Sequence, residues 1–185
     1  SLSPTLVYAG HPVSSLVFSV AQDSSYTLTN LAIVVPGTWT WSHLTSSVTL
    51  AGSAFASAAA SITGDTLFVT GASLTPADSG TVTIAGLTAP AVKGSSLFHV
   101  RTAVAAGTLT PIVQHPSVRV LELVPIVTIH VNDATGVATA PYAVGAEATI
   151  TGIVTANLST TRTDVYVQDG TAGINVFNAA LAPLT

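Results

Sequence analysis

Five histidines are the residues best suited to metal binding or proton transfer, because the chain contains no cysteine. No two of them form an HxH or HxxxH pair, so no zinc motif is present. Serine is abundant, but no G-x-S-x-G sequence presents one as a hydrolase nucleophile. The pattern predicts no catalytic residue, and each histidine is interpreted as a surface or strand residue. The histidines are His11, His43, His99, His115 and His130.

Three carboxylates near turns of the C-terminal third are the candidates for calcium binding. They are Asp133, Asp164 and Asp169, which Asn132 or Asn175 would supplement. Carboxylate and amide oxygens are the ligands that calcium prefers. The spacing of an EF-hand loop is absent, and Asn-Asp and Asp-Gly are also ordinary turn pairs. Calcium is therefore the one cofactor considered, and turn formation is the alternative role. No carboxylate pair of the glycosidase type stands out.

Two tryptophans could form a carbohydrate-binding platform. Trp39 and Trp41 alternate with threonines, so they share one face of a predicted strand. Together with Tyr26 they could offer flat aromatic surfaces that stack on sugars. The alternative is that this face belongs to the core of a sandwich, in which case both indoles are buried.

The sequence Asn157-Leu158-Ser159 is an acceptor sequon for N-linked glycans. It lies in a loop rich in serine and threonine, where a glycan would be accessible. The general abundance of these hydroxyl residues would also suit O-linked sugars. Asn157 is therefore the candidate modification site.

The composition is that of an exported β-protein. Charged residues make up 6% of the chain, against roughly 25% in typical globular domains. The apolar fraction is 48%, which excludes intrinsic disorder. The longest apolar stretches, 31–36 and 121–127, are far shorter than the roughly 20 residues of a membrane-spanning helix. The chain has no methionine, so we expect either a removed signal peptide or a longer parent chain. We favour secretion, with an extracellular or cell-surface location.

Short apolar runs punctuated by turn residues predict an all-β fold. Residues 1–124 contain many such runs at intervals of roughly 10–15 residues, which predicts an Ig-like β-sandwich. The cysteine pair and the tyrosine corner of antibody domains are absent, so the resemblance is one of architecture. The alanine-rich stretch 51–61 is expected to form a short helix or an irregular crossover.

A second β module is expected over residues 125–185, after Pro125. Its strand signals are the alternating runs 148–154, 164–168 and 173–177, and a turn over 169–173 separates the last two. This pattern resembles the OB-fold module of large secreted bacterial proteins, including extracellular nucleases. The resemblance implies an OB-like β-barrel of five strands. The sequence accounts for about four of these strands, so we expect a module that is truncated here or completed by a neighbouring chain.

Nucleic-acid binding does not follow from this resemblance. Contacts to phosphates require lysine or arginine, and an OB groove also uses stacking aromatic residues. Residues 125–185 contain one base, Arg162, and four acids, which are Asp133, Glu147, Asp164 and Asp169. We therefore expect no binding of nucleic acid.

The functional hypothesis is a non-enzymatic, secreted or cell-surface structural module. It would be a subunit of an extracellular filament, surface layer or adhesin that assembles through β-strand addition. Its partners would be copies of itself or neighbouring domains of a longer chain, with glycans as further ligands. The candidate donor strands lie near the N-terminus and consist of Leu6, Val7, Tyr8, Leu16, Val17 and Phe18. The alternative is a ligand-binding accessory module of an extracellular nuclease or another secreted hydrolase.

Overall fold

The computed structural model describes residues 1–22, 25–105 and 107–182. Strands account for 48% of the structure and helices for 6%, so the prediction of an all-β protein is confirmed. The chain divides into two compact units, Ser1–Leu121 (unit 1) and Glu122–Thr185 (unit 2). Among the described residues, no helix has the length and apolar character needed to cross a membrane.

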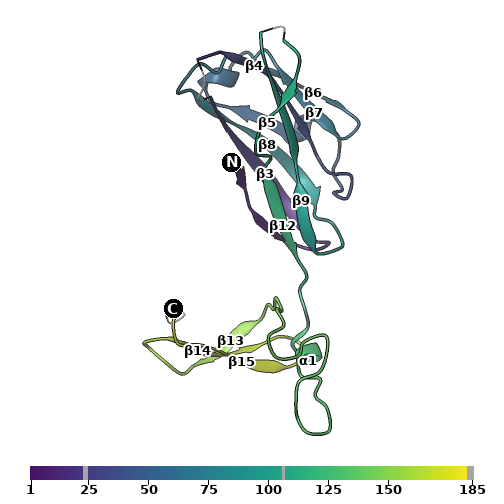
Figure 1. The fold of residues 1–185 in the computed structure, drawn as a ribbon, viewed down its shortest axis with the longest axis vertical. Coiled ribbons are helices and arrows are strands. Elements are labelled where there is room, and N and C mark those ends of the chain that lie inside the picture. Colours follow the sequence, from purple (N-terminus) through teal and green to yellow (C-terminus); the bar gives the residue numbers. More distant parts are fainter. Residues whose placement is uncertain (23–24, 106, 183–185) are drawn as a thin grey trace. The chain divides into compact units, whose positions relative to one another are not determined.

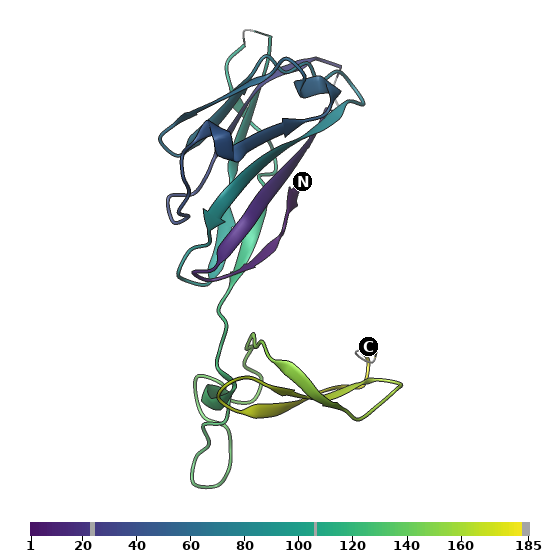
Figure 2. The ribbon, with the colours of Figure 1, turned by 180° about the vertical axis from the view of Figure 1, so that it is seen from behind.

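The first sheet of unit 1 has the strand order β1-β3-β8-β5, and all its neighbours are antiparallel (Figure 1). The longest pairing joins β3 to β8, from Pro12 opposite Thr88 to Ala21 opposite Ser79. Figure 2 shows the short N-terminal strand beside β3. The strands are β1 (Leu2–Ser3), β3 (Pro12–Ala21), β5 (Val48–Ala51) and β8 (Ser79–Thr88).

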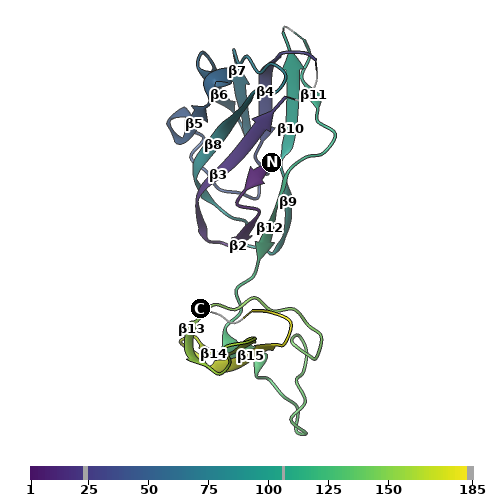
Figure 3. The same cartoon turned by 90° about the vertical axis from the view of Figure 1, so that its left-hand side faces the viewer.

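The second sheet of unit 1 has the order β11-β10-β4-β7-β6 (Figure 3). The alanine-rich stretch forms one 3-10 turn, Ser53–Phe55, and then enters β6, because each residue of β6 from Ala59 to Thr63 pairs with β7. Local helix propensity is thus overridden by sheet pairing. The strands are β4 (Leu28–Val34), β6 (Ala59–Thr63), β7 (Thr66–Thr70), β10 (His99–Val104) and β11 (Thr110–Pro111).

A third, smaller sheet completes unit 1, with the order β2-β12-β9. Here β2 (Leu6–Tyr8) runs parallel to β12 (Ser117–Leu121), and β9 (Gly94–Leu97) runs antiparallel to it. A second 3-10 turn, Thr45–Ser47, precedes β5.

The core of unit 1 contains apolar side chains from all three sheets, as expected for a β-sandwich. Phe98 is fully buried, and its ring meets the rings of Phe18 and Trp39 edge-on, each at a centroid distance of 5.5 Å. Such edge-to-face pairs stabilise a core beyond the area that they bury.

Gly80 packs closely against Phe55 and the backbone of Ala51. A Cβ atom built on Gly80 would lie 2.6 Å from the ring of Phe55 and 2.8 Å from the carbonyl oxygen of Ala51. The turn Ser53–Phe55 can therefore lie against β8 only because residue 80 has no side chain.

Unit 2 contains one antiparallel sheet with the order β13-β14-β15. Its elements are α1 (Ile126–Ile129), β13 (Ile153–Asn157), β14 (Thr163–Gln168) and β15 (Gly173–Asn178). The expected strand over 148–154 begins only at Ile153, and a bulge separates Val154 from Ala156. Within the described residues no sheet closes into a barrel.

The helix α1 forms although its sequence, Ile-Val-Thr-Ile, favours a strand. The turn between β14 and β15 supplies acceptors for the first N–H groups of this helix. The N–H of Ile126 donates to Asp169 Oδ2 at 2.8 Å, and the N–H of Val127 donates to Thr171 Oγ1 at 3.1 Å. These bonds satisfy groups that a helix N-terminus otherwise leaves unpaired.

Candidate functional site

Two of the three carboxylates proposed for calcium, Asp133 and Asp169, hold turns together, and the third, Asp164, lies within β14. Asp133 Oδ1 accepts hydrogen bonds from Thr135 N, Thr135 Oγ1 and Val137 N at 2.6–3.0 Å. Asp169 Oδ1 accepts from Thr171 N, Thr171 Oγ1 and Ala172 N at 2.6–2.9 Å. Within the described ranges, no three His, Cys, Asp or Glu side chains gather where they could hold a metal. Asp133, Asp164 and Asp169 are therefore not brought together as calcium ligands.

These hydrogen bonds also favour the charged form of each carboxylate. The hydroxyl of Thr171, followed by the N–H of Ile126, holds the pKa of Asp169 well below its usual range. The hydroxyl of Thr135 is the first cause of the lowered pKa of Asp133. Both shifts result from hydrogen bonds with neutral donors.

The tryptophan platform is not formed. Trp39 and Trp41 are 4% and 6% exposed and belong to the core of unit 1. The predicted strand over 38–41 does not form, since only Thr40 makes an isolated bridge, to Thr88. Neither indole presents a flat surface to a sugar. Tyr26 is 67% exposed, so it faces solvent, whereas both tryptophans are buried. Of the two interpretations of the alternating pattern, the buried one is correct.

The N-terminal donor strands are already used within unit 1. Val7, Leu16 and Phe18 are buried in its core. The segment Leu6–Tyr8 pairs with β12, and the segment Leu16–Phe18 pairs with β8. Donation of these residues to another chain would remove two strands from the donor's own sandwich. Alternation alone could not reveal this, because a strand has the same pattern whether it pairs within its chain or with another.

Two histidine pairs in unit 1 were not anticipated from the sequence. His43, at the unusual φ of 55°, lies beside Trp41, and its Nε2 is 3.0 Å from Asp65 Oδ1. This hydrogen bond lowers the pKa of Asp65. Close by in the sequence, Ser42 Oγ donates to Ser47 Oγ at 3.1 Å. The described residues thus hold an exposed His43–Asp65 pair, with side chains 44% and 49% exposed.

His115 has a structural task at the wall of a groove. Between β11 and β12 the chain leaves the sheet edge, and His115 Nδ1 accepts the N–H of Val100 at 3.0 Å. As the acceptor of this bond, Nδ1 carries no proton, so in the neutral ring the proton lies on Nε2. The ring of His99 lies edge-on at 4.8 Å.

The groove itself has a volume of about 740 Å³ and lies between β3 and the 112–117 segment. Apolar side chains such as Phe18, Leu31 and Ile112 line it, with hydroxyls and amides at its rim. Among the described residues, its lining contains no Lys, Arg, Asp or Glu. Its described lining offers apolar contact together with hydrogen bonds from hydroxyls and amides.

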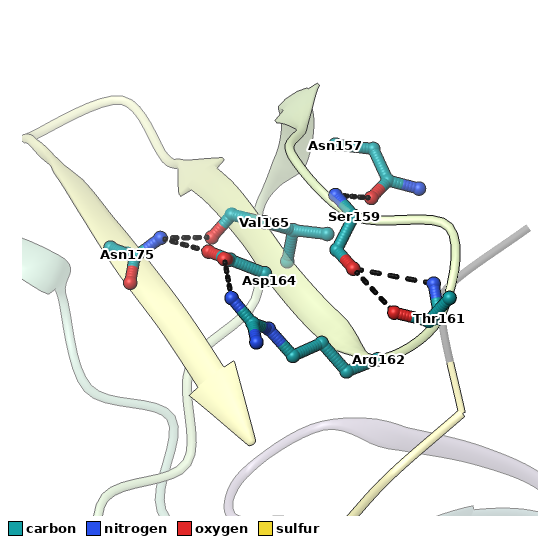
Figure 4. Close-up of polar contacts among 7 residues, drawn as sticks. All are labelled: Asn157, Ser159, Thr161, Arg162, Asp164, Val165 and Asn175. Carbon is teal, nitrogen blue, oxygen red and sulfur yellow. Dashed lines mark hydrogen bonds and ion pairs between the residues drawn. The ribbon is translucent and has the colours of Figure 1, made fainter. Parts of the chain in front are cut away.

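The outer face of the unit 2 sheet carries a compact group of polar side chains, Arg162, Asp164 and Asn175 (Figure 4), with the ring of Phe177 beside Arg162. The guanidinium of Arg162 lies 3.6 Å from Asp164 Oδ2 and 5.0 Å from the centre of the Phe177 ring. Asn175 Nδ2 donates to Asp164 Oδ1 at 3.2 Å and to the carbonyl oxygen of Val165 at 3.3 Å. Tyr166 is directly opposite Asn175 in the ladder. The face therefore combines exposed rings with fixed donors and acceptors.

One edge of this sheet is open. In an antiparallel ladder, every second pair of opposite residues exchanges main-chain hydrogen bonds. The bond from Asp169 N to Ala172 O across the turn sets this alternation, so the pairs formed by Ile174 and Val176 are bonded to β14. The main-chain groups of Asn175 and Phe177 therefore point away from β14. On this open side, His130 Nε2 donates a hydrogen bond to the carbonyl oxygen of Gly173 at 2.9 Å. In the part of the chain that the structure describes, no main-chain partner covers Asn175 or Phe177.

Unit 2 also has a very small core. Its described part buries three apolar side chains, Val124, Ile126 and Val165, and the other buried apolar side chains among the described residues lie in unit 1. Large apolar side chains remain exposed on its sheet, including Ile153 at 75% and Phe177 at 55%. An open edge beside exposed apolar residues is typical of a surface that pairs with another chain.

No protein-family model matches the chain, and no curated protein is similar to it.

Proposed function

We propose that the chain is a non-enzymatic, secreted or cell-surface structural module that assembles with copies of itself by β-strand addition at β15. The observation that carries this proposal is the open edge of β15 on a unit with three buried apolar side chains. An added strand would satisfy the main-chain groups of Asn175 and Phe177 and would cover apolar surface that water now contacts. Repeated head to tail, such addition builds a filament or a surface layer.

The test uses proline at Phe177. The N–H of Phe177 faces the open side, so Phe177→Pro removes a donor for an incoming strand without removing a bond to β14. Phe177→Ala is the matched control, because it removes the same ring and keeps the N–H. We expect the parent and Phe177→Ala to form concentration-dependent oligomers in light scattering, and Phe177→Pro to remain monomeric.

Hydrogen exchange provides a second readout that does not depend on the proline variant. The amides of Asn175 and Phe177 should exchange quickly at low protein concentration and become protected as assemblies form. A parent that stays monomeric at all concentrations, or a folded Phe177→Pro variant that assembles like the parent, would refute the proposal.

The outer face of the unit 2 sheet, with Tyr166 and Phe177 exposed on it, favours a second candidate function, a ligand-binding accessory module for a secreted hydrolase. Tyr166 and Phe177 are exposed and could stack on a neutral sugar, with Asn175 as a hydrogen-bonding group. Binding of soluble polysaccharides in calorimetry that is lost in Tyr166→Ala and in Phe177→Ala, although Phe177→Ala keeps the N–H for strand addition, would favour this function over assembly.

A further inference from the structure

Asn157 is the last residue of β13 and the first residue of the sequon Asn157-Leu158-Ser159. Of the five asparagines in the chain, it is the only one followed two residues later by serine or threonine. We propose that Asn157 Nδ2 is the acceptor of an N-linked glycan when the chain is exported.

The local geometry makes this side chain accessible. Asn157 is exposed, and Leu158 beside it is 58% exposed. The chain turns away from the sheet at this point, and Ser159 N donates to Asn157 Oδ1 at 3.3 Å (Figure 4). Leu158 N donates to the carbonyl oxygen of Asp164 at 2.8 Å, which anchors the loop to β14. A transferase could therefore reach the carboxamide without opening the pairing of β13 with β14.

The same turn suits the chemistry of the transfer. Asn157 Nδ2 forms a bond to the anomeric carbon of a pyrophosphate-activated sugar, which the transferase supplies. The bond between this carbon and the pyrophosphate oxygen breaks, and the pyrophosphate leaves with the electron pair. Nδ2 loses one proton to a base of the transferase. The hydrogen bond from Ser159 N to Oδ1 stabilises negative charge that spreads over the amide as this proton leaves.

A glycan on Asn157 would affect which edge strand of the unit 2 sheet remains accessible to another chain. β13 and β15 are the two edge strands, on opposite sides of β14. A hydrated glycan at the end of β13 would cover exposed apolar residues such as Val154 and Leu158 and obstruct strand addition there. Only this consequence rests on the proposed assembly at β15; the modification does not.

The experiment expresses the 185-residue chain through a eukaryotic secretory pathway and measures its intact mass. We expect a glycan mass on the parent that is lost in Asn157→Gln and Ser159→Ala and kept in Ser159→Thr. Ser159→Ala is the decisive variant, because it retains the N–H that bonds to Asn157 Oδ1 and removes only the hydroxyl of the sequon. Asn175→Gln is the control, since it changes an asparagine of the same sheet that lies outside any sequon.

Peptide N-glycosidase treatment in heavy-oxygen water then locates the site, because it converts the modified Asn157 to a labelled aspartate. If the chain is not secreted, the purified folded protein is offered to an oligosaccharyltransferase with a lipid-pyrophosphate-linked sugar. An unmodified parent in either format, or a glycan that persists in Ser159→Ala, would overturn the proposal. Either result would leave the Phe177 test of assembly unaffected.

Discussion

Replacing Ile126 with alanine should unfold unit 2 and leave unit 1 folded. Ile126 is fully buried and is one of three buried apolar side chains in the described part of unit 2. Truncating a buried isoleucine to alanine costs about 2–5 kcal/mol. Small domains with little core lie at the low end of the usual stability range of roughly 5–15 kcal/mol. The substitution therefore removes most of the stability available to unit 2.

Hydrogen exchange read by mass spectrometry reports each unit separately. A loss of about 2–5 kcal/mol corresponds to a rise of roughly 30-fold to several thousand-fold in the opening equilibrium. We expect this rise in the peptides that cover β14 and β15, and no change in those that cover β3 and β8.

Val127→Ala is the matched control. Val127 lies in the same helix and is 48% exposed, so its truncation should change stability by no more than about 0.5 kcal/mol. Alanine is a better helix former than isoleucine or valine, so neither substitution lowers helix propensity. A loss of stability in Ile126→Ala alone would therefore result from the lost burial of the Ile126 side chain. Unchanged protection in Ile126→Ala, or an equal loss in Val127→Ala, would refute the reasoning.

Three further predictions concern the core, pH and nucleic acid. Phe98→Ala removes the ring that contacts Phe18 and Trp39 and should lower the stability of unit 1 by about 3–5 kcal/mol. Tryptophan fluorescence should show this as a lowered melting temperature, and a melting temperature like that of the parent would contradict the prediction. The folded-state pKa of Asp169 lies below its ordinary value of 3.8, so its stabilising contribution is present above that pH and is lost as the pH falls below it. Exchange in β14 and β15 should therefore rise in acid, and Asp169→Asn should flatten this dependence; an equally steep rise in the variant would show that other groups cause it. Single-stranded DNA should show no binding in fluorescence anisotropy at physiological salt. Arg162 is the only lysine or arginine in the sequence of unit 2, and its guanidinium is paired with Asp164. A micromolar affinity that weakens with salt would contradict this prediction.

The features predictable from the sequence are those that depend on neighbours along the chain. Alternation in Thr81–Ile84 places Val82 and Ile84 in the core, as the structure shows. The pattern then shifts at Gly86, whose φ of 67° lets Leu87 enter the core out of phase. The turn at Asp169 was also evident, because Asp-Gly and the threonine after it form local hydrogen bonds.

The features that could not be predicted depend on distant residues. The helical turn at Ile126 forms because Asp169 and Thr171, more than 40 residues later, accept its N–H groups. Two further contacts also join segments that lie apart in the sequence. Leu6–Tyr8 pairs with β12, and Val100 donates a hydrogen bond to His115, which lies outside any strand. At the candidate site, the sequence identified Asn157 and the solitary Arg162. It could not show that Arg162, Asp164, Asn175 and Phe177 share one face, because this depends on the register of β14 with β15.

The close contact of Gly80 with Phe55 also gives a way to trace the ancestry of this protein. Any side chain at residue 80 would collide with a ring and with backbone, so substitution there should be rejected during evolution even where the surface has changed completely. Gly152 is under the same restriction, since a Cβ atom would lie 2.5 Å from the carbonyl oxygen of Gln168. Two glycines, one in each unit, should therefore persist in descendants whose other residues have diverged, and their spacing can serve as a marker for distant homologues.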